Sequence, residues 1–321
     1  MRLFSRRTLR ALLNPWLVRV GASPDYKIEN TLVVTGAPRS GTTWLAEVIA
    51  CVPRTALLFE PLNVQTIPEA KAAGLITLNY FEPGEVWPEG EVFFERLLRG
   101  KVCNWWTTSA MKVSRTIRPQ RWVVKFVRAN LLLGWLTSYF PIRLPALLVR
   151  HPCATIASRL VRGWSPMIHK PSAQKFFLAH PDLKLITERL TDPVEYLAAL
   201  WCIETYAPLA LPQPYPFHLM CYESLVRDVR QQLEMLCNHW NLEMSDKMIE
   251  QLHRPSHTTK KKVDSLRRGD SLIQWRKELS DGDVQRILRV VRAFGLDFYS
   301  YEVEPDYDRL YQRLHASSAK G

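Results

Sequence analysis

The chain has 321 residues, of which 47% are hydrophobic and 23% are charged. These proportions are ordinary for a globular protein with a sizeable core, and they exclude a mainly disordered chain, a collagen and a small disulfide scaffold. The 43 Lys and Arg residues outnumber the 31 Asp and Glu residues, which gives a net charge of +12. Such an excess favours an anionic partner: a nucleic acid, a phosphorylated cofactor or an acidic lipid surface.

The six cysteines form no C-x-x-C pair. A zinc site or a thioredoxin-like site therefore has no support, and we expect reduced, buried thiols in a cytoplasmic protein.

Residues 1–26 form a basic amphipathic N-terminal segment. Its arginines are interleaved with large apolar residues, and the first acidic residue is Asp25. Because the charges are spread along it, the segment does not have the pattern of a secretory signal. Two alternatives remain open: a helix that attaches peripherally to an anionic membrane, or a helix that packs on its own domain with solvated arginines.

Short apolar runs alternate with helical patterns along the rest of the chain. Runs at residues 31–35, 55–59, 122–126, 145–149 and 217–221 predict five strands. They lack the alternation of a half-exposed strand, as expected when helices cover both faces of a parallel sheet. Apolar residues at helical spacing follow at 225–240 and 284–294, and we expect them in the core. Residues 60–120 and 163–192 are less regular and rich in Trp, Pro and Gly, and they are expected to form loops around a site.

We therefore predict an α/β fold, with one domain over residues 27–300 and a central parallel sheet flanked by helices. Residues 301–321 are assigned to a C-terminal tail.

The sequence GAPRSGTTWL, residues 36–45, lies between the first predicted strand and the next helix. Glycines there let the backbone N–H groups curl around an anion, and the start of the helix adds partial positive charge. We call residues 36–43 the phosphate loop. A nucleotide triphosphatase would have a lysine after the second glycine, but Thr42 holds that position and the cation lies inside the loop as Arg39. A P-loop nucleotide kinase or NTPase is therefore the weaker alternative.

A second anion-binding pattern occurs about a hundred residues later. Arg150 ends the fourth predicted strand, and Ser158 follows eight residues downstream in the next helix. A guanidinium can bind two phosphate oxygens at once, and a hydroxyl donates one more hydrogen bond.

Together these residues resemble the cofactor-binding motifs of sulfotransferases that use 3′-phosphoadenosine 5′-phosphosulfate (PAPS), which have a P-loop-like fold. The resemblance implies that Arg39 contacts the phosphosulfate and that Arg150 and Ser158 bind the 3′-phosphate. The other positions that match cofactor-binding residues of the family are Ser40, Gly41, Thr42 and Thr43 for the 5′-phosphate, Trp44 and Tyr222 for adenine, and Arg267, Arg268 and Gly269 for a loop over the 3′-phosphate.

The resemblance also bears on the catalytic base. Cytosolic members use the histidine of a Lys-x-His segment, but here Lys125 is followed at that position by Val127. Residues 59–62, Phe-Glu-Pro-Leu, are similar to a segment of carbohydrate sulfotransferases, which implies Glu60 as the general base. Lys125 is expected to contact the sulfonate, and Arg128 and Lys112 are weaker candidates for this contact. No metal is expected to be required, because Arg and Lys can neutralise the developing charge.

We therefore expect a PAPS-dependent sulfotransferase that acts on a hydroxyl of a glycan, a glycolipid or another small molecule. An inactive nucleotide-binding protein of the same fold is an alternative that Val127 favours. Nucleic acid is not expected as a partner, because the charge is not concentrated in a recognition module.

Overall fold

The computed structural model describes residues 25–111, 119–164, 173–258 and 270–316. Most of the N-terminal basic segment and the loop at 267–269 therefore lie outside the described residues. Within the described ranges, the longest apolar helices are all too short or too polar to cross a membrane.

The core of the molecule is a sheet of five parallel strands in the order β2-β3-β1-β4-β5. The strands are β1 (Thr31–Thr35), β2 (Thr55–Phe59), β3 (Arg121–Lys125), β4 (Ala146–Val149) and β5 (His218–Cys221). Almost every residue of β1, β2, β3 and β4 is buried, because helices cover both faces of the sheet. The predicted α/β class with a helix-flanked parallel sheet is confirmed.

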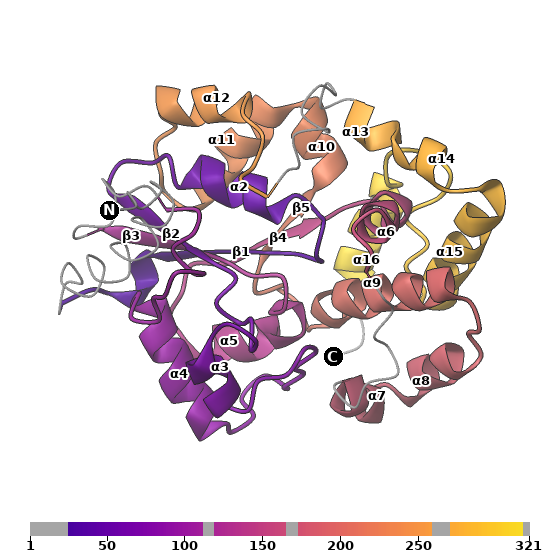
Figure 1. Ribbon diagram of the computed structural model, residues 1–321, viewed down its shortest axis with the longest axis horizontal. Helices are drawn as coiled ribbons and strands as arrows, with labels where there is room; N and C mark the ends of the chain where they lie inside the picture. Colours follow the sequence, from indigo (N-terminus) through magenta and orange to yellow (C-terminus); the bar gives the residue numbers. More distant parts are fainter. Residues whose placement is uncertain (1–24, 112–118, 165–172, 259–269, 317–321) are drawn as a thin grey trace, which may run out of the picture.

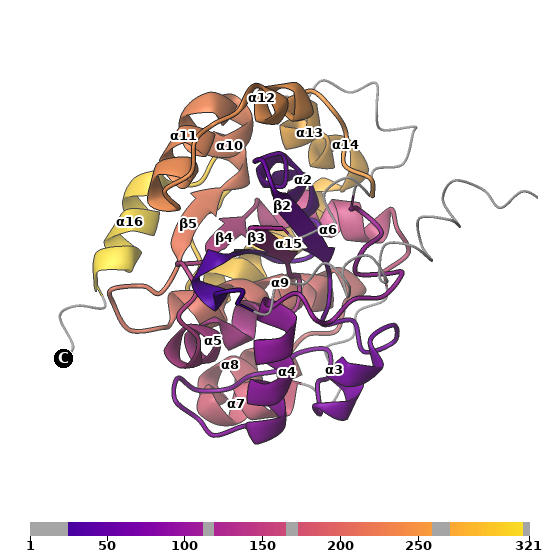
Figure 2. The same ribbon diagram turned by 90° about the vertical axis from the view of Figure 1, so that its left-hand side faces the viewer.

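Alternate strand residues face different helices. Leu32 and Val34 pack in one hydrophobic cluster with α2 and α11, whereas Val33 packs in another with α4 and α5. A third cluster joins β4 to α6, α9 and α15. Figure 1 shows α2 and α10–α12 on one side of the sheet and α3–α5 on the other, and Figure 2 shows the same arrangement from the side.

The helices up to α9 are η1 (Ile28–Asn30), α2 (Thr42–Ile49), α3 (Pro68–Ala72), α4 (Pro88–Leu98), η3 (Asn130–Leu132), α5 (Leu133–Tyr139), α6 (Pro152–Leu160), α7 (Gln174–Ala179), α8 (Pro181–Glu188) and α9 (Pro193–Leu209). Those after β5 are α10 (Tyr222–Arg227), α11 (Val229–His239), α12 (Asp246–Leu252), α13 (Asp270–Ile273), α14 (Trp275–Glu278), α15 (Asp281–Ala293) and α16 (Tyr307–Ala316).

The stretches that we expected to be irregular contain helices. Residues 60–120 include α3 and α4, and residues 163–192 include α7 and α8. Three of these four helices begin with a proline, which suits the first helical position because its missing N–H would be unpaired there. The prolines therefore mark helix starts. In the stretch assigned to a tail, α16 forms and buries Leu310 against the third cluster.

His151 is a structural residue at the start of α6. Its Nδ1 accepts a hydrogen bond from the backbone N–H of Cys153 (3.2 Å), so its proton lies on Nε2, 3.0 Å from the carbonyl oxygen of Ser300. Its ring stacks on Trp275 with the centroids 4.8 Å apart. Burial lowers the pKa of His151 from its ordinary 6.5 to about 4.

This burial predicts an acid-sensitive fold. As the pH falls from about 6.5 to about 4, the unfolded chain takes up the imidazole proton first, so the stability present above this window is lost within it. The full contribution corresponds to roughly 3 kcal/mol. Chemical denaturation across this pH range should show a steeper loss of unfolding free energy for the wild type than for His151→Gln. Parallel curves for the two proteins would contradict the prediction.

Candidate functional site

The carboxyl ends of the five strands meet at one edge of the sheet, and each is followed by a residue that the sequence singled out. The phosphate loop follows β1, Glu60 follows β2, Lys125 ends β3, Arg150 follows β4 and Tyr222 follows β5. Because of the strand order, Glu60 and Lys125 lie on one side of the phosphate loop and Arg150 and Tyr222 on the other. The chain reverses direction across the sheet between β1 and β4, where open α/β sheets bind their ligands.

Both glycines of the phosphate loop are required by close contacts. A Cβ on Gly36 would lie 2.3 Å from the carbonyl oxygen of Leu148, on the neighbouring strand. Gly41, the residue before α2, has a φ of +94°, and its Cβ would lie 2.6 Å from the ring of Tyr222. The loop can therefore approach β4 and Tyr222 only without side chains at these two positions.

Arg39 connects the two predicted phosphate motifs. Its Nε donates a hydrogen bond to Oγ of Ser158 (3.0 Å), and its carbonyl oxygen accepts one from Nη1 of Arg150 (3.0 Å). The Arg150 guanidinium also lies 4.4 Å from the centre of the Tyr222 ring. Residues more than a hundred positions apart in the sequence thus form one cluster.

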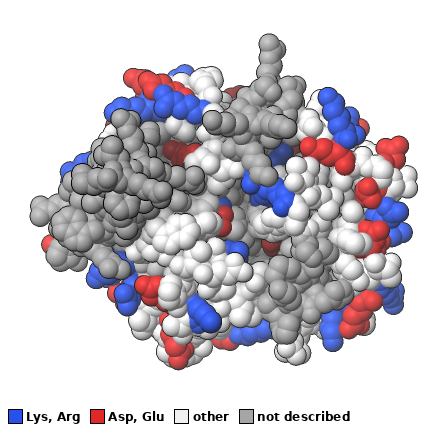
Figure 3. Space-filling model, viewed as in Figure 1, with Lys and Arg blue, Asp and Glu red and all other residues white. Residues whose placement is uncertain are grey.

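Positive charge is concentrated in this cluster. Burial and the neighbouring guanidinium groups of Arg162 and Arg150 lower the pKa of Arg39 from 12.5 to about 10. Among the described residues, no carboxylate oxygen lies within 4.0 Å of a guanidinium nitrogen of Arg39, Arg150 or Arg162. Within the same part of the chain, Nε of Arg150 is buried and has no hydrogen-bond partner. This arrangement suits a multiply charged anion. On the face of the molecule drawn in Figure 3, Lys and Arg atoms lie in a hollow near the centre.

Glu60 is held by three neighbours at the ends of β2 and β3. Nζ of Lys125 donates a hydrogen bond to Oε1 (2.5 Å), and Nη1 of Arg128 lies 4.0 Å from Oε2. Nε1 of Trp106 donates to the Glu60 carbonyl oxygen (3.2 Å). Burial lowers the pKa of Lys125, and the negative charge of Glu60 opposes this shift. The carboxylate is thus fixed through one oxygen, while the other faces a weaker cationic contact.

Arg39 and Glu60 share an uncommon backbone conformation. They are two of the four non-glycine residues with positive φ among the described residues, at +79° and +41°. Such conformations cost about 1–3 kcal/mol each and cluster at functional sites, where the surroundings enforce them.

Aromatic side chains lie beside Glu60. The Phe59 ring is 5.4 Å from that of Trp106 and 4.7 Å from that of His257, measured between centroids. Trp105 packs edge-on against Trp106 and is 55% exposed. Through Trp106, which donates to the Glu60 carbonyl oxygen, this exposed indole connects to the segment that carries Glu60 and offers a surface for a substrate.

Several of the predicted cofactor-binding side chains are buried. Trp44 is buried in the cluster between α2 and the sheet. The Ser40 side chain is also buried, and its hydroxyl donates to the carbonyl oxygen of Ala37 (2.6 Å). Thr42 is buried, whereas Gly41 and Thr43 are partly exposed. Lys112, Arg267, Arg268 and Gly269 lie outside the described residues, so their roles stay predictions.

Sequence reasoning missed Arg159 and its partner Glu204. Arg159 is fully buried, and its Nη2 donates to Oε2 of Glu204 (2.6 Å). Its Nε donates to the carbonyl oxygen of Pro38 (3.3 Å), inside the phosphate loop. Glu204 stands in the long apolar helix α9, and this isolated acid was the signal that could have identified a buried pair.

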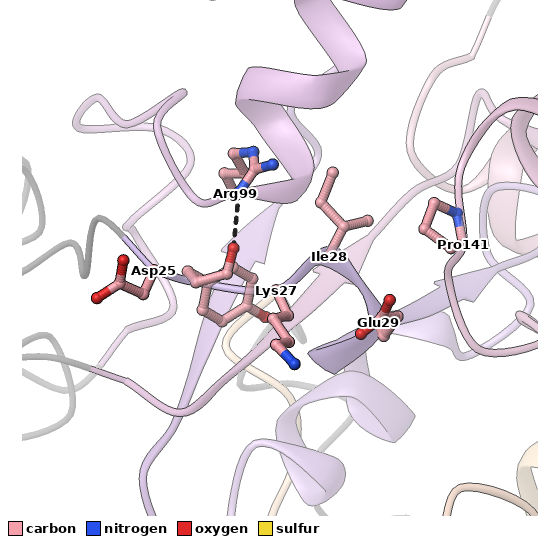
Figure 4. Close-up of a pocket in the computed structure, with 7 residues that line it drawn as sticks. Asp25, Lys27, Ile28, Glu29, Arg99 and Pro141 are labelled. Carbon is pink, nitrogen blue, oxygen red and sulfur yellow. Dashed lines mark hydrogen bonds between the residues drawn. The ribbon is translucent and has the colours of Figure 1, made fainter.

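A separate pocket lies where the chain enters β1, near the amino ends of the strands. Figure 4 shows Arg99 donating a hydrogen bond to the carbonyl oxygen of Tyr26 (2.7 Å), beside Lys27, Glu29 and Pro141. It contains none of the residues of the candidate site.

A sulfotransferase family model matches residues 31–246, which include all five strands and both phosphate motifs. The chain belongs to the sulfotransferase family. A sequence comparison with curated proteins finds no match.

Solved structures with similar folds include several sulfotransferases. The sulfotransferase domain of the Synechococcus PCC 7002 olefin synthase is 17% identical, with 87% of this chain and 98% of that domain covered and a TM-score of 0.48. Mouse sulfotransferase SULT7A1 complexed with PAP is 14% identical, with 97% and 96% covered and a TM-score of 0.42. Sulfotransferase STF9 from Mycobacterium avium is 15% identical, with 93% and 83% covered and a TM-score of 0.44.

The phosphate loop of this sulfotransferase should tolerate no side chain at Gly41. We expect Gly41→Ala to lower the unfolding free energy more than Gly163→Ala does. The difference between the two losses should be about 1–3 kcal/mol. Both glycines have positive φ, but a Cβ on Gly163 meets nothing within 4 Å, whereas one on Gly41 meets Tyr222. The comparison, made by chemical denaturation, isolates the contact with Tyr222. Equal losses in the two variants would show that this contact imposes no constraint.

Proposed function

We propose that this sulfotransferase transfers the sulfonate of PAPS to an acceptor hydroxyl. The observation that carries the proposal is the cation cluster, in which Arg39 lies in direct contact with both Arg150 and Ser158. PAPS carries anionic groups on its 5′ and 3′ sides, so it would supply the direct anionic contact that Arg39 and Arg150 do not have among the described residues. The buried, unpartnered Nε of Arg150 supports the fit.

The proposed assignments follow the positions of the residues around the loop. The 5′-phosphate would be bound by Ser40, Gly41, Thr42 and Thr43, and the phosphosulfate by Arg39. Arg150 and Ser158 would bind the 3′-phosphate. Tyr222, which packs against Arg150 and Gly41, would border the adenine. The remaining proposed contacts are those of Trp44 to adenine and of Arg267, Arg268 and Gly269 to the 3′-phosphate.

Glu60 is the proposed general base. The acceptor oxygen forms a bond to sulfur as the bond between sulfur and the bridging phosphate oxygen breaks. The acceptor proton passes to Oε2 of Glu60, because Oε1 is already bound to Lys125. The leaving bisphosphate keeps the electron pair of the broken bond. Arg39 in the phosphate loop and Lys125 at the end of β3 stabilise the negative charge that develops on the bridging oxygen.

The proposed acceptor is a hydroxyl of a carbohydrate or glycolipid. The Phe-Glu-Pro-Leu segment supports this choice, as does the exposed indole of Trp105, which packs against Trp106 near the Glu60 backbone. Flat aromatic faces pack well on the C–H faces of sugar rings, while a neighbouring carboxylate binds their hydroxyls.

We also propose a cytoplasmic location with peripheral membrane attachment through the basic N-terminal segment. All six cysteines are buried and lie outside any disulfide bond, which is compatible with a reducing compartment. The arginine-rich composition of the segment would favour anionic lipids.

Cofactor choice can be tested by calorimetry. Adenosine 3′,5′-bisphosphate should bind more tightly than 5′-AMP, because Arg150 and Ser158 add contacts to the 3′-phosphate; a charged contact of this kind contributes about 1.5–3 kcal/mol. In Arg150→Ala the difference between the two nucleotides should shrink.

Two results would oppose this assignment. Equal affinities of the wild type for the two nucleotides would remove the 3′-phosphate site. A strict requirement for Mg²⁺, seen as loss of binding in EDTA, would favour a nucleotide kinase or NTPase.

The catalytic roles of Glu60 and Arg39 can be separated kinetically. Glu60→Gln should keep nucleotide affinity and lower turnover by ~10²–10⁴, the usual contribution of a positioned base. Arg39→Ala should lower both nucleotide affinity and turnover, because this cation holds the donor and stabilises the leaving group. Transfer of labelled sulfate from PAPS to a panel of glycolipids and sugars provides the readout.

Glu195→Gln is the matched control for the loss of a paired carboxylate. Glu195 is buried on α9 and pairs with Arg289, outside the candidate site. It should lower stability without a comparable loss of turnover. Near wild-type turnover of Glu60→Gln at saturating acceptor would show that the base lies elsewhere.

A further inference from the structure

A closed ring of hydrogen bonds lies beneath the first half of the phosphate loop. Oγ1 of Thr35, the last residue of β1, donates to Oδ1 of Asn130 in η3 (2.7 Å). Nδ2 of Asn130 donates to the carbonyl oxygen of Glu204 in α9 (2.8 Å). Arg159 of α6 then bridges the Glu204 carboxylate and the carbonyl oxygen of Pro38. The chain from Thr35 through residues 36 and 37 to Pro38 closes the ring. We call these five residues the loop ring.

The loop ring is shielded from water. Thr35 and Arg159 are fully buried, and Asn130 and Glu204 are 3% and 5% exposed. Hydrogen bonds in such surroundings are strengthened by the low local dielectric, and loss of one leaves a buried polar group unsatisfied. Each link is therefore costly to break.

The two ends of the ring bracket the glycine turn. Thr35 directly precedes Gly36, and Pro38 directly precedes Arg39, whose φ of +79° is unfavourable for a residue with a side chain. Since Pro38 has no N–H, its carbonyl oxygen is the polar backbone group through which the fold can hold it. The second half of the loop is closed separately, by hydrogen bonds from the N–H and hydroxyl of Ser40 to Ala37.

We propose that the loop ring is a positioning device that keeps the phosphate loop in its anion-binding conformation before a ligand arrives. Arg159 and Glu204 act as positioning residues: they hold the Pro38 carbonyl and thereby orient Arg39. The inference rests on the proposed function, in which this loop binds the 5′ side of the donor. Preorganisation of this kind raises affinity because the ordering cost is met during folding.

The charge of Glu204 has a second effect. Arg159 adds to the positive charge around Arg39, and its ion pair with Glu204 offsets that charge at the back of the site. The ring can therefore use a guanidinium to hold the loop, while Arg39 and Arg150 remain the cations that face a ligand.

The Thr35 link allows a test that changes no charge. Thr35→Val keeps the shape of the side chain, removes the donor to Asn130 and should weaken binding of adenosine 3′,5′-bisphosphate by roughly ten-fold. Thr35→Ser keeps the hydroxyl and should restore wild-type affinity. Hydrogen exchange of the loop amides at residues 36, 37 and 39–41 should be faster in Thr35→Val than in the wild type and Thr35→Ser.

Thr55→Val is the matched control. Thr55 is equally buried, on β2, and its hydroxyl donates to the nearby Pro53 carbonyl oxygen (3.3 Å). It should lower the melting temperature without changing bisphosphate affinity or exchange in the loop. A structural role of Thr35 alone would likewise change only the melting temperature.

The outcomes separate this inference from the proposed function. Wild-type affinity and wild-type loop exchange in Thr35→Val would overturn the positioning role. A wild-type protein that does not bind the bisphosphate would overturn the proposed donor, and exchange of the loop amides would then still decide whether the ring holds the loop.

Discussion

The concentration of positive charge at one edge of the sheet is the constraint on which the candidate site depends. Three guanidinium groups are held there by neutral acceptors: Arg39 by the Ser158 hydroxyl, Arg150 by the Arg39 and Ser271 carbonyl oxygens, and Arg162 by the Thr258 carbonyl oxygen. Carbonyl and hydroxyl dipoles satisfy hydrogen bonds without cancelling charge. The cluster therefore keeps its attraction for an anion. The pKa of Arg39 is lowered by its burial first and by the neighbouring guanidinium groups second.

The strand order separates the proposed nucleotide-binding residues from the proposed acceptor-binding residues along the sheet edge. Arg150 and Tyr222 follow β4 and β5, on the side of the proposed nucleotide site. Glu60 follows β2 and Lys125 ends β3, on the side of the proposed acceptor site. The phosphate loop after β1 stands between them. A reaction between two bound molecules needs this geometry, because the group in transit must face both. Behind the loop, the buried ion pair of Arg159 with Glu204 adds little net charge.

Much of the fold was predictable because its signals are local. Apolar runs of five residues predicted all five strands, with bounds within one residue of those observed. Nine of the ten helical positions expected in the core are buried, and only Val229 is partly exposed. The errors came from reading proline as a sign of irregular chain. Pro68, Pro88 and Pro181 instead begin helices, where their fixed φ is already helical.

The sequence by itself pointed to the phosphate loop, the Arg150 and Ser158 pair and the candidate base Glu60, because each lies in a short stretch of chain that begins at the end of a strand. Only the tertiary structure decided that Ser158 contacts Arg39, that Lys125 pairs with Glu60, and that Arg159 and Glu204 close a ring under the loop. These contacts join residues 45 to 119 positions apart. Such contacts leave no periodic pattern in the sequence, because they arise only when the sheet brings the carboxyl ends of its strands together.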